Sequence, residues 1–375
     1  MNVEIKAFNF SYWPQFVDLI NKYWKANHPI INKELFEWQY TGFGPQKGIQ
    51  NSKLLFVNGK IEGFRGAIPG IYQINGKHLA GYSGSVWIIN QEFRGLGLGS
   101  LMVNEINSKF DVHCSLGVNV KTAGAIYKKK GYAGFDALNR YVIPLIPDEY
   151  LTLLSAQVSF SKINSWFQSV PLKNQEKQIK IDGNSLQRLW EKTLGEKKFF
   201  GLYRNNSFWN WRYLNNIGFK YLFFGNPETV GIVIVRVEKV LNERSQKVLR
   251  IIEILPANID TWNKQKDPRM KNLLLGVLSW AKENGCVAAD FQISNTRLSA
   301  LLEDVGFLKQ NENYLPPEVS LAGLFQPFVL KPAPINGTYF IKDKSGNQVI
   351  PELENTYFVK SDNDMDRTNY WPVID

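Results

Sequence analysis

A glycine-rich turn is the segment of this sequence whose residue types and spacing are best suited to chemistry. It reads Arg94-Gly95-Leu96-Gly97-Leu98-Gly99 and lies between an apolar strand and an amphipathic helix that we expect to begin near Ser100. Glycines allow the backbone to turn tightly and to approach a ligand closely. The first N–H groups of the helix have no intrahelical partner and lie at its positive end, so the turn is suited to binding an anion such as a diphosphate.

Two common nucleotide-binding motifs do not match this turn. No Gly-Lys-Ser or Gly-Lys-Thr follows it, which excludes a P-loop NTPase. The turn contains G-x-G-x-G rather than the G-x-G-x-x-G of a Rossmann dinucleotide site. That site also needs an acidic residue at the end of the next strand, whereas Asp111 precedes its strand.

The hydrophobic pattern around the turn alternates between strand-like and helix-like segments, which indicates an α/β or α+β architecture. The Asn58-Gly59 dipeptide predicts a hairpin within 54–70. The helix after the turn has one apolar face, because apolar residues recur at every fourth position: Leu98, Met102, Ile106 and Phe110. The other elements that we expect are helices over 15–24 and 33–40, strands over 81–90 and 112–119, and a short helix that ends at Gly131.

The second half of the chain repeats the first half weakly, but in the same order. The segment FEWQY at 36–40 is echoed by WNWRY at 209–213. Residues 117–132 align without gaps on residues 292–307. The apolar strands and the amphipathic helix between these segments also recur, so the length of the chain is explained by duplication of one unit.

This repeat divides the chain into four parts. We predict two copies of one α/β unit, over 1–145 and 200–325, each with a mixed, largely antiparallel sheet flanked by helices. Residues 146–199 are expected to form a connector with a helical segment of its own. Residues 326–375 are expected to form a C-terminal tail, and its aromatic residues favour packing back on the two units.

The composition excludes several classes of protein. Two cysteines and three histidines in 375 residues are too few for a disulfide framework or a cysteine-rich zinc site, and the histidines lack metal-ligand spacing, so we expect no metal. No uncharged apolar run reaches the roughly 18 residues of a membrane span, and no signal sequence is apparent, which favours a cytoplasmic protein. The net charge of +10 favours nucleic acid or a phosphorylated ligand.

The glycine-rich turn resembles motif A of the GNAT superfamily of acyl-CoA-dependent N-acyltransferases, whose pattern is R/Q-x-x-G-x-G/A. The predicted order of helices, hairpin, strand and helix is also similar to that of GNAT proteins. A second GNAT signature is an Asn after the next strand, followed by a helix with A-x-x-x-Y and then Gly and an aromatic residue. The matching residues here are Asn119, Ala123, Tyr127, Gly131 and Tyr132.

The resemblance implies where acyl-CoA is held and which groups assist the reaction. In that family, amides of the loop hold the CoA diphosphate, an N–H of the preceding strand stabilises the oxyanion, and a tyrosine donates to the leaving thiolate. Tyr127 is the matching donor; a tyrosine packed on a helix face is the alternative. The residues implied to line the acyl-CoA site are Trp87, Ile88, Ile89, Arg94, Gly95, Leu96, Gly97, Leu98, Gly99, Ser100, Asn119, Ala123 and Tyr127.

The general base is less well defined, because GNAT proteins use a carboxylate, a histidine or a water chain. His113 lies on the strand beside the implied acyl site, and Glu92 lies in the loop before the glycine-rich turn. His28, between the first two helices, is a third candidate. A buried, hydrogen-bonded histidine and an exposed loop carboxylate are the alternative interpretations of His113 and Glu92.

The second copy resembles a degenerate GNAT unit. The loop before its amphipathic helix, within 255–271, contains no glycine, so we expect it to lack the phosphate-binding turn. Leu302 takes the place of Tyr127, and Ser294 that of Asn119. These losses predict one acyl-CoA site in the chain.

The resemblance therefore implies transfer of an acyl group from acetyl-CoA or another acyl-CoA to an amine. The W-x-Y element in both copies and the Asp-rich tail resemble bacterial two-domain GNATs of surface-polysaccharide synthesis. The acceptor implied is the amine of a nucleotide-linked amino sugar, of the dTDP-3-amino-3,6-dideoxyhexose type, and the acyl group is acetyl or a larger one such as hydroxybutanoyl. The alternatives are a Fem-like aminoacyl transferase of cell-wall synthesis and a basic nucleic-acid-binding protein. We expect no nucleic-acid partner.

Overall fold

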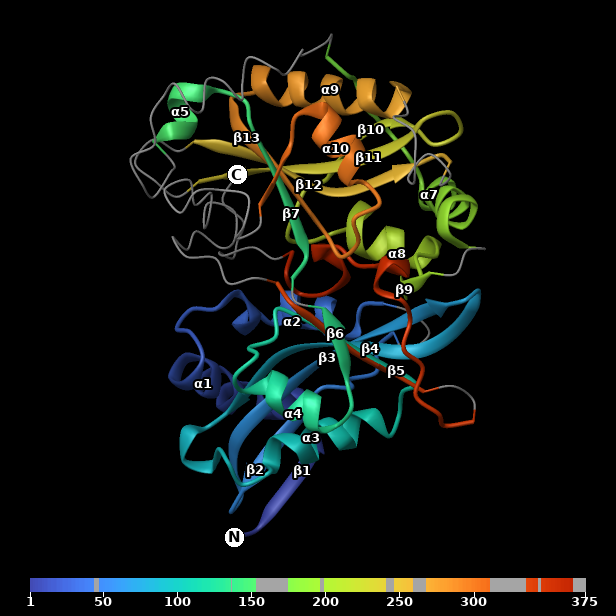
Figure 1. Ribbon diagram of the computed structural model, residues 1–375. Helices are drawn as coiled ribbons and strands as arrows, with labels where there is room; N and C mark the ends of the chain where they lie inside the picture. Colours follow the sequence, from blue (N-terminus) through green and yellow to red (C-terminus); the bar gives the residue numbers. More distant parts are fainter. Residues whose placement is uncertain are drawn as a thin grey trace.

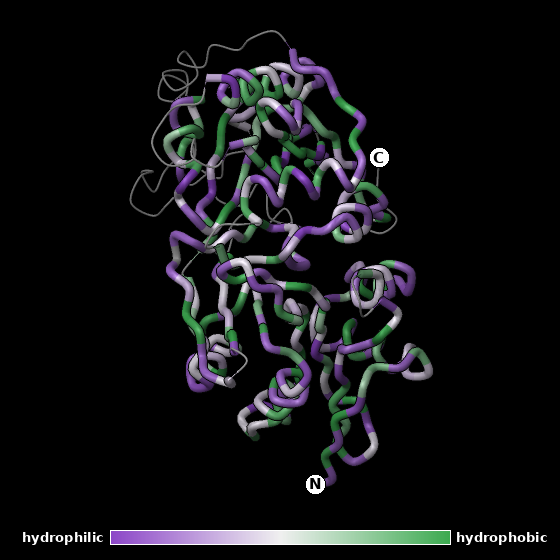
Figure 2. Tube along the Cα trace, turned by 90° about the vertical axis from the view of Figure 1, so that its right-hand side faces the viewer, coloured by the Kyte–Doolittle hydropathy of each residue, from purple (hydrophilic) through white to green (hydrophobic). Residues whose placement is uncertain are grey.

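The computed structural model describes residues 1–43, 47–135, 137–152, 175–195, 199–240, 246–258, 268–310, 335–342 and 345–366. These residues form two mixed, largely antiparallel sheets, which lie one above the other along the long axis of the molecule (Figure 1). The same two-part shape is visible from the side in Figure 2. None of the helices in the described ranges is long and apolar enough to cross a membrane.

The first sheet contains most of the strands that the sequence predicts around the glycine-rich turn. Its main path is β1 (Val3–Ala7), β2 (Lys53–Val57), β3 (Lys60–Ile74), β4 (Lys77–Ile89), β5 (Val112–Leu116), β15 (Gly337–Ile341) and β6 (Ala133–Phe135). The β2–β3 hairpin turns at Asn58-Gly59, where both residues have a positive φ, as a type I′ turn requires. β4 and β5 pair in parallel, whereas the neighbouring strands are antiparallel.

Helices cover both faces of this sheet because successive strand residues point to opposite sides. On one face, α1 (Trp13–Tyr23) and α2 (Lys33–Thr41) pack through a cluster that includes Phe16, Phe36 and Phe64. On the other face, α3 (Leu98–Asn107) packs Leu98 and Met102 against Leu55 and Val57. The short helix α4 (Ala123–Lys129) follows β5 and buries Tyr127.

The second sheet repeats this plan. Its order is β14 (Leu308–Gln310), β7 (Asn139–Pro144), β13 (Cys286–Ile293), β12 (Lys247–Pro256), β11 (Gly231–Lys239), β10 (Leu222–Asn226) and β8 (Gln178–Ile179). The helices around it are α5 (Pro147–Leu151), α7 (Gly183–Trp190), α8 (Asn206–Trp209), α9 (Pro268–Glu283) and α10 (Ser299–Val305). β12 and β13 form its parallel pair, in the place that β4 and β5 take in the first sheet.

The two sheets exchange strands. β7, which lies at the end of the predicted first unit, is placed between β13 and β14 of the second sheet. In return β15, which follows the second repeat, lies between β5 and β6 of the first sheet. β7 ends one residue before the unit boundary that we predicted at 145, yet it pairs with strands of the second sheet. Sheet membership therefore does not follow the linear division of the chain.

The C-terminal residues 356–366, here called the interface segment, lie between the two sheets (Figure 1). They begin with β16 (Thr356–Tyr357), which pairs with β9 (Phe200–Leu202). β9 also pairs with β3, through Tyr72 and Leu202 among others. The interface segment is therefore joined to the first sheet by main-chain hydrogen bonds.

Candidate functional site

The candidate site lies where β4 and β5 stop pairing. Their parallel register runs from Gly81 and Val112 to Gly84 and Ser115. β4 then continues to Ile89, and among the described residues β3 is the strand that pairs with it there. The two strands thus diverge after Gly84 and Ser115, and we call the space between their ends the first fork. The glycine-rich turn follows the end of β4, so it lies at the open side of this fork.

The glycine-rich turn is exposed and leads into the first turn of α3. Gly97 is the N-cap of α3 and has a φ of 76°, in the left-handed region that favours glycine. No atom outside the neighbouring residues lies within 4 Å of where its Cβ would be, so the turn is open to solvent. Gly99 instead permits close packing, because a Cβ there would lie 2.9 Å from the Trp87 ring. Arg94 is exposed, and its Nε donates to the carbonyl of Ile89 at 2.9 Å, which closes the base of the turn.

Tyr127 reaches the first fork from α4 and is 1% exposed. Its hydroxyl accepts a hydrogen bond from Nη2 of Arg65 and lies 3.3 Å from the hydroxyl of Ser115 and 3.5 Å from Nε2 of His113. The centre of its ring lies 5.5 Å from that of Trp87. The structure thus brings together three of the residues that the sequence singled out: Trp87, His113 and Tyr127.

His113 is buried on β5 and hydrogen-bonded through both ring nitrogens. Its Nδ1 lies 2.7 Å from the hydroxyl of Tyr82 and 2.6 Å from that of Tyr132. Its Nε2 lies 3.1 Å from the hydroxyl of Ser115 and 3.2 Å from Nη2 of Arg65. Burial, reinforced by the charge of Arg65, lowers the pKa of His113 well below its usual value. The imidazole is therefore neutral at neutral pH.

Sequence reasoning missed Arg65, which lies at the centre of this cluster. Its side chain comes from β3 and is 2% exposed. Nη1 donates to the carbonyl of Ser85 at 2.6 Å, and Nη2 donates to the hydroxyl of Ser115 at 3.2 Å. A Cβ on Gly84 would collide with the guanidinium. The signal in the sequence was an arginine between glycines in an otherwise apolar strand.

The remaining predicted residues lie at the edge of this cluster or outside it. Asn119 is exposed, and its Oδ1 accepts from the N–H of Lys121 at 3.0 Å, so it shapes the turn before α4. Glu92 is exposed, and its carboxylate makes no ion pair within the described part of the chain. His28 caps a 3₁₀ turn, where its Nδ1 accepts from the N–H of Ile30 at 3.1 Å. Ile88 is buried in the α1–α2 cluster, Ile89 contacts the α3 side of β4, and Ala123 is half-buried at the start of α4.

The matching fork of the second sheet is filled by the chain itself. The register of β12 and β13 ends at Arg250 and Asp290. Beyond that point the N–H of Ser294 donates to the carbonyl of Phe358 at 2.8 Å, and the N–H of Phe358 donates to Oγ of Ser294 at 2.9 Å. Ile293 bridges to Val359 on the side away from β7. The interface segment thus occupies the space that is a fork in the first sheet.

Two residues of the second copy that align with residues of the implied acyl-CoA site lie in packed surroundings. Leu302, which aligns with Tyr127, is fully buried in the core. Ser294, which aligns with Asn119, binds the interface segment. Most of the loop that we predicted to lack a phosphate-binding turn, from 259 to 267, lies outside the described residues.

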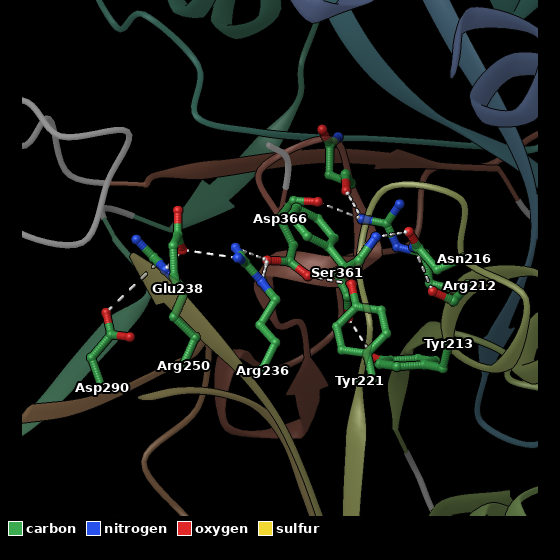
Figure 3. Close-up of polar contacts among 12 residues, drawn as sticks. Arg212, Tyr213, Asn216, Tyr221, Arg236, Glu238, Arg250, Asp290, Ser361 and Asp366 are labelled. Carbon is green, nitrogen blue, oxygen red and sulfur yellow. Dashed lines mark hydrogen bonds and ion pairs between the residues drawn. The ribbon is translucent and has the colours of Figure 1, made fainter. Parts of the chain in front are cut away.

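Ion pairs anchor the interface segment to the second sheet (Figure 3). Arg236 on β11 pairs with Asp366 at 2.9 Å, and the hydroxyl of Tyr221 donates to the same carboxylate at 2.6 Å. Although burial opposes ionisation, the charge of Arg236 holds the pKa of Asp366 well below its usual range. Arg204 pairs with Asp362 at 2.7 Å. Two of the acidic residues of the Asp-rich tail are therefore partners of arginines.

Residues 362 and 363 of the interface segment contact β4 at the first fork. The carbonyl of Asp362 accepts from the hydroxyl of Ser83 at 2.9 Å, and the amide of Asn363 donates to the carbonyl of Gly84 at 3.1 Å. A narrow cavity lies beside these contacts, between the two sheets. Its lining includes Tyr72, Ser83, Arg212, Asp362 and Asn363.

Solved structures of acyltransferases share this fold at low sequence identity. The chain is similar to a probable N-acyltransferase from Enterococcus faecalis V583, with a TM-score of 0.57 at 12% identity over 91% of this chain and 73% of that chain. A GCN5-related N-acetyltransferase from Anabaena variabilis gives a TM-score of 0.54 at 12% identity, with the same coverage of 91% and 73%. N-myristoyltransferase from Saccharomyces cerevisiae, with bound myristoyl-CoA, gives 0.55 at 10% identity over 95% of this chain and 89% of that chain.

These similarities confirm the predicted fold: the protein has the GNAT fold. No protein-family model and no curated protein matches the sequence.

Proposed function

We propose that this protein is an acyl-CoA-dependent N-acyltransferase with one acyl-CoA site, at the first fork. The observation that carries the proposal is the open turn around Gly97, at the start of α3 and at the mouth of the first fork, in a chain with the GNAT fold. The second fork is filled by residues 356–359, which supports a single site.

Acyl-CoA would be held by main-chain groups of the glycine-rich turn. The N–H groups between Leu96 and Ser100 lie at the positive end of α3, where a diphosphate is favoured. Bound there, acyl-CoA supplies a thioester that an amine can attack. Within the described ranges, the strand residues from Trp87 to Ile89 have no partner strand on the β5 side, so an N–H there is available to stabilise an oxyanion.

Tyr127 is the proposed partner of the leaving sulfur. Its hydroxyl lies in the first fork and accepts from Arg65, so its own proton is free to be donated. Burial raises the pKa of Tyr127 above that of a free thiol, so the phenol holds its proton at neutral pH. The hydroxyl therefore acts as a hydrogen-bond donor to sulfur rather than as a strong acid.

His113 remains the better supported of the proposed bases. A neutral imidazole can accept a proton, and the pKa of His113 is low enough to keep it neutral. The hydroxyls of Tyr132 and Ser115 are hydrogen-bonded to His113, so either can relay a proton between the imidazole and the first fork. Glu92 stays a prediction, because its exposed carboxylate lies outside the cluster.

The proposed acceptor is the amine of an amino sugar, linked to a nucleotide as in dTDP-3-amino-3,6-dideoxyhexoses. The family resemblance of the sequence suggests this substrate. The narrow cavity between the sheets, beside Ser83, Arg212 and Asn363, has a volume of about 10 Å³, enough for about one water molecule, so the proposed acceptor is not assigned to it.

Thermal unfolding in the presence of CoA and acetyl-CoA tests the proposal. A ligand that binds only the native state raises the melting temperature, by an amount that grows with its concentration. No shift at millimolar CoA would refute the acyl-CoA site and would leave the Fem-like and nucleic-acid-binding alternatives open. Release of free thiol from acetyl-CoA, screened against free and nucleotide-linked amino sugars, then identifies the acceptor.

A further inference from the structure

Arg65 is a buried positive charge whose hydrogen-bond acceptors are all neutral. They are the carbonyl of Ser85, the hydroxyls of Ser115 and Tyr127, and Nε2 of the neutral His113. Across the described ranges of the chain, no carboxylate lies within ion-pair distance of its guanidinium. Its Nε is also buried without a hydrogen-bond partner. The guanidinium thus keeps its full positive charge inside the first fork.

Some buried arginines of the second half of the molecule pair with carboxylates, whereas the buried Arg212 donates to the main-chain carbonyls of Asn363 and Asp366. Arg204 pairs with Glu253 and Asp362, and Arg236 pairs with Glu238 and Asp366. Burying a charge without a counterion carries a large desolvation penalty, which explains those pairs. Burial of Arg65 carries this desolvation penalty next to Tyr127 and His113, the residues that we propose take part in the reaction of the thioester.

Aromatic rings hold Arg65 in place without cancelling its charge. Its guanidinium lies 4.8 Å from the centre of the Trp87 ring and 5.9 Å from that of Tyr127. Such contacts favour a cation but carry no net negative charge. The first fork therefore has a fixed positive centre, ready to stabilise a negative charge that forms during a reaction.

Arg65 is the charged side chain among those packed around the Tyr127 hydroxyl. The neighbours of that side chain are Arg65 from β3, Trp87 from β4, His113 and Ser115 from β5, and Tyr132 after α4. His113 is neutral at neutral pH, and burial keeps the phenols of Tyr127 and Tyr132 protonated. Arg65 is therefore the group with a net positive charge that can stabilise an anion next to Tyr127, in addition to neutral hydrogen-bond donors.

From this arrangement, and resting on the proposed function, we infer that Arg65 is a positioning residue for acyl transfer: it orients the Tyr127 hydroxyl toward the sulfur and stabilises the leaving thiolate. The amine attacks the thioester carbonyl, a C–N bond forms, and the carbonyl electron pair moves to oxygen. As that pair returns, the C–S bond breaks and its electrons stay on sulfur. The nitrogen loses its proton to the base, and Arg65 stays protonated throughout.

The pKa of the thiol of bound CoA measures this effect and requires no acceptor amine. A thiolate absorbs ultraviolet light more strongly than a thiol, so the pKa of the thiol can be measured by titrating CoA on the full-length protein. We expect a value at least about one unit below the roughly 8.5 of a free thiol, which is a tenfold larger acid dissociation constant. Arg65→Gln should abolish the shift, whereas Arg65→Lys, which keeps the charge, should retain most of it.

Arg297→Gln is a matched control. Arg297 also lies over an aromatic ring, 5.0 Å from the centre of Phe199, but it belongs to the second half of the molecule. This variant should leave the thiol pKa of bound CoA unchanged.

A thiol pKa in the unmodified protein that equals or exceeds the free value would overturn the inference while leaving CoA binding intact. If R65Q does not fold, the titration of the unmodified protein still decides the question. Absence of any CoA binding would instead show as a missing thermal shift, and would refute the proposed function itself.

Discussion

The side-chain amide of Asn363 donates to the main-chain carbonyl of Gly84 at 3.1 Å, although 279 residues separate the two in the chain. This bond joins the interface segment to the last residue of β4 that still pairs with β5. The segment that fills the second fork thus also contacts the beginning of the first, before Asp366 pairs with Arg236 of the second sheet. The bond thus connects the two halves of the molecule at the first fork, where we propose that acyl-CoA binds.

The Asn363–Gly84 bond should contribute to stability and not to CoA binding. Asn363→Ala removes the donor and leaves a buried carbonyl unsatisfied, which should cost about 1–3 kcal/mol of unfolding free energy. Denaturant unfolding measures the loss, and titration with CoA should give an unchanged affinity. Asn284→Ala is the control, since its exposed amide donates to the carbonyl of Trp280 at 2.8 Å. An equal loss in both variants would argue against the bond.

Gly97→Ala should weaken CoA binding selectively. An alanine at a φ of 76° is strained by about 1–2 kcal/mol, and relief of that strain displaces the N–H groups of the turn. We expect the dissociation constant of CoA, measured by calorimetry, to rise about tenfold or more. Gly285→Ala introduces the same strain, at a φ of 80° with equally open surroundings, but after α9. It should lower stability alone, and a similar loss of CoA affinity there would contradict the assignment of the turn.

Tyr127→Phe should reduce turnover more than it weakens CoA binding. The variant removes the hydroxyl proposed to donate to sulfur, so kcat should fall about 10- to 100-fold, the effect of one hydrogen bond to a charged group. Steady-state kinetics with an identified amine, together with direct CoA titration, separate the two effects. An unchanged kcat would remove Tyr127 from the reaction.

Leu302→Ala, at the aligned position of the second half, should do the opposite. Leu302 is fully buried, so the cavity should cost about 2–5 kcal/mol of stability. CoA affinity, measured on the folded fraction, should not change. A selective loss of CoA affinity would indicate a second acyl-CoA site.

His113 should make stability depend on pH in acid. Because burial lowers its pKa in the folded state, the unfolded chain binds this proton more readily. The stabilising effect is complete above about pH 6.5 and is lost as the pH falls through the folded pKa, by about 1.4 kcal/mol per pH unit. Denaturant unfolding at a series of pH values should show that slope.

His113→Gln should flatten the dependence below pH 6.5. His78→Gln is the comparison, since His78 is partly exposed, makes a ring contact with Tyr203 and has a pKa that burial lowers less strongly. An unchanged slope in H113Q would show that His113 is not the group that titrates.

The sequence by itself determined the local parts of this site. The Asn58-Gly59 hairpin, the turn around Gly97 and the helix that carries Tyr127 depend on backbone preferences and on apolar spacing within a few residues. The repeat indicated that two such units follow each other, and the aligned Leu302 indicated that the second lacks a matching tyrosine.

Only the tertiary structure decided which distant segments meet. A strand such as β7 shows its own pattern of residues but not its neighbours, because main-chain hydrogen bonds are the same for every partner; hence the exchange of β7 and β15 was not predicted. Arg65 was missed for a related reason. The role that we propose for its charge depends on its contacts with Ser85, Ser115 and Tyr127, which belong to three other elements. It also depends on the lack of a nearby carboxylate in the described chain. The sequence located the glycine-rich turn, and the packing of distant strands placed a positive charge in the first fork.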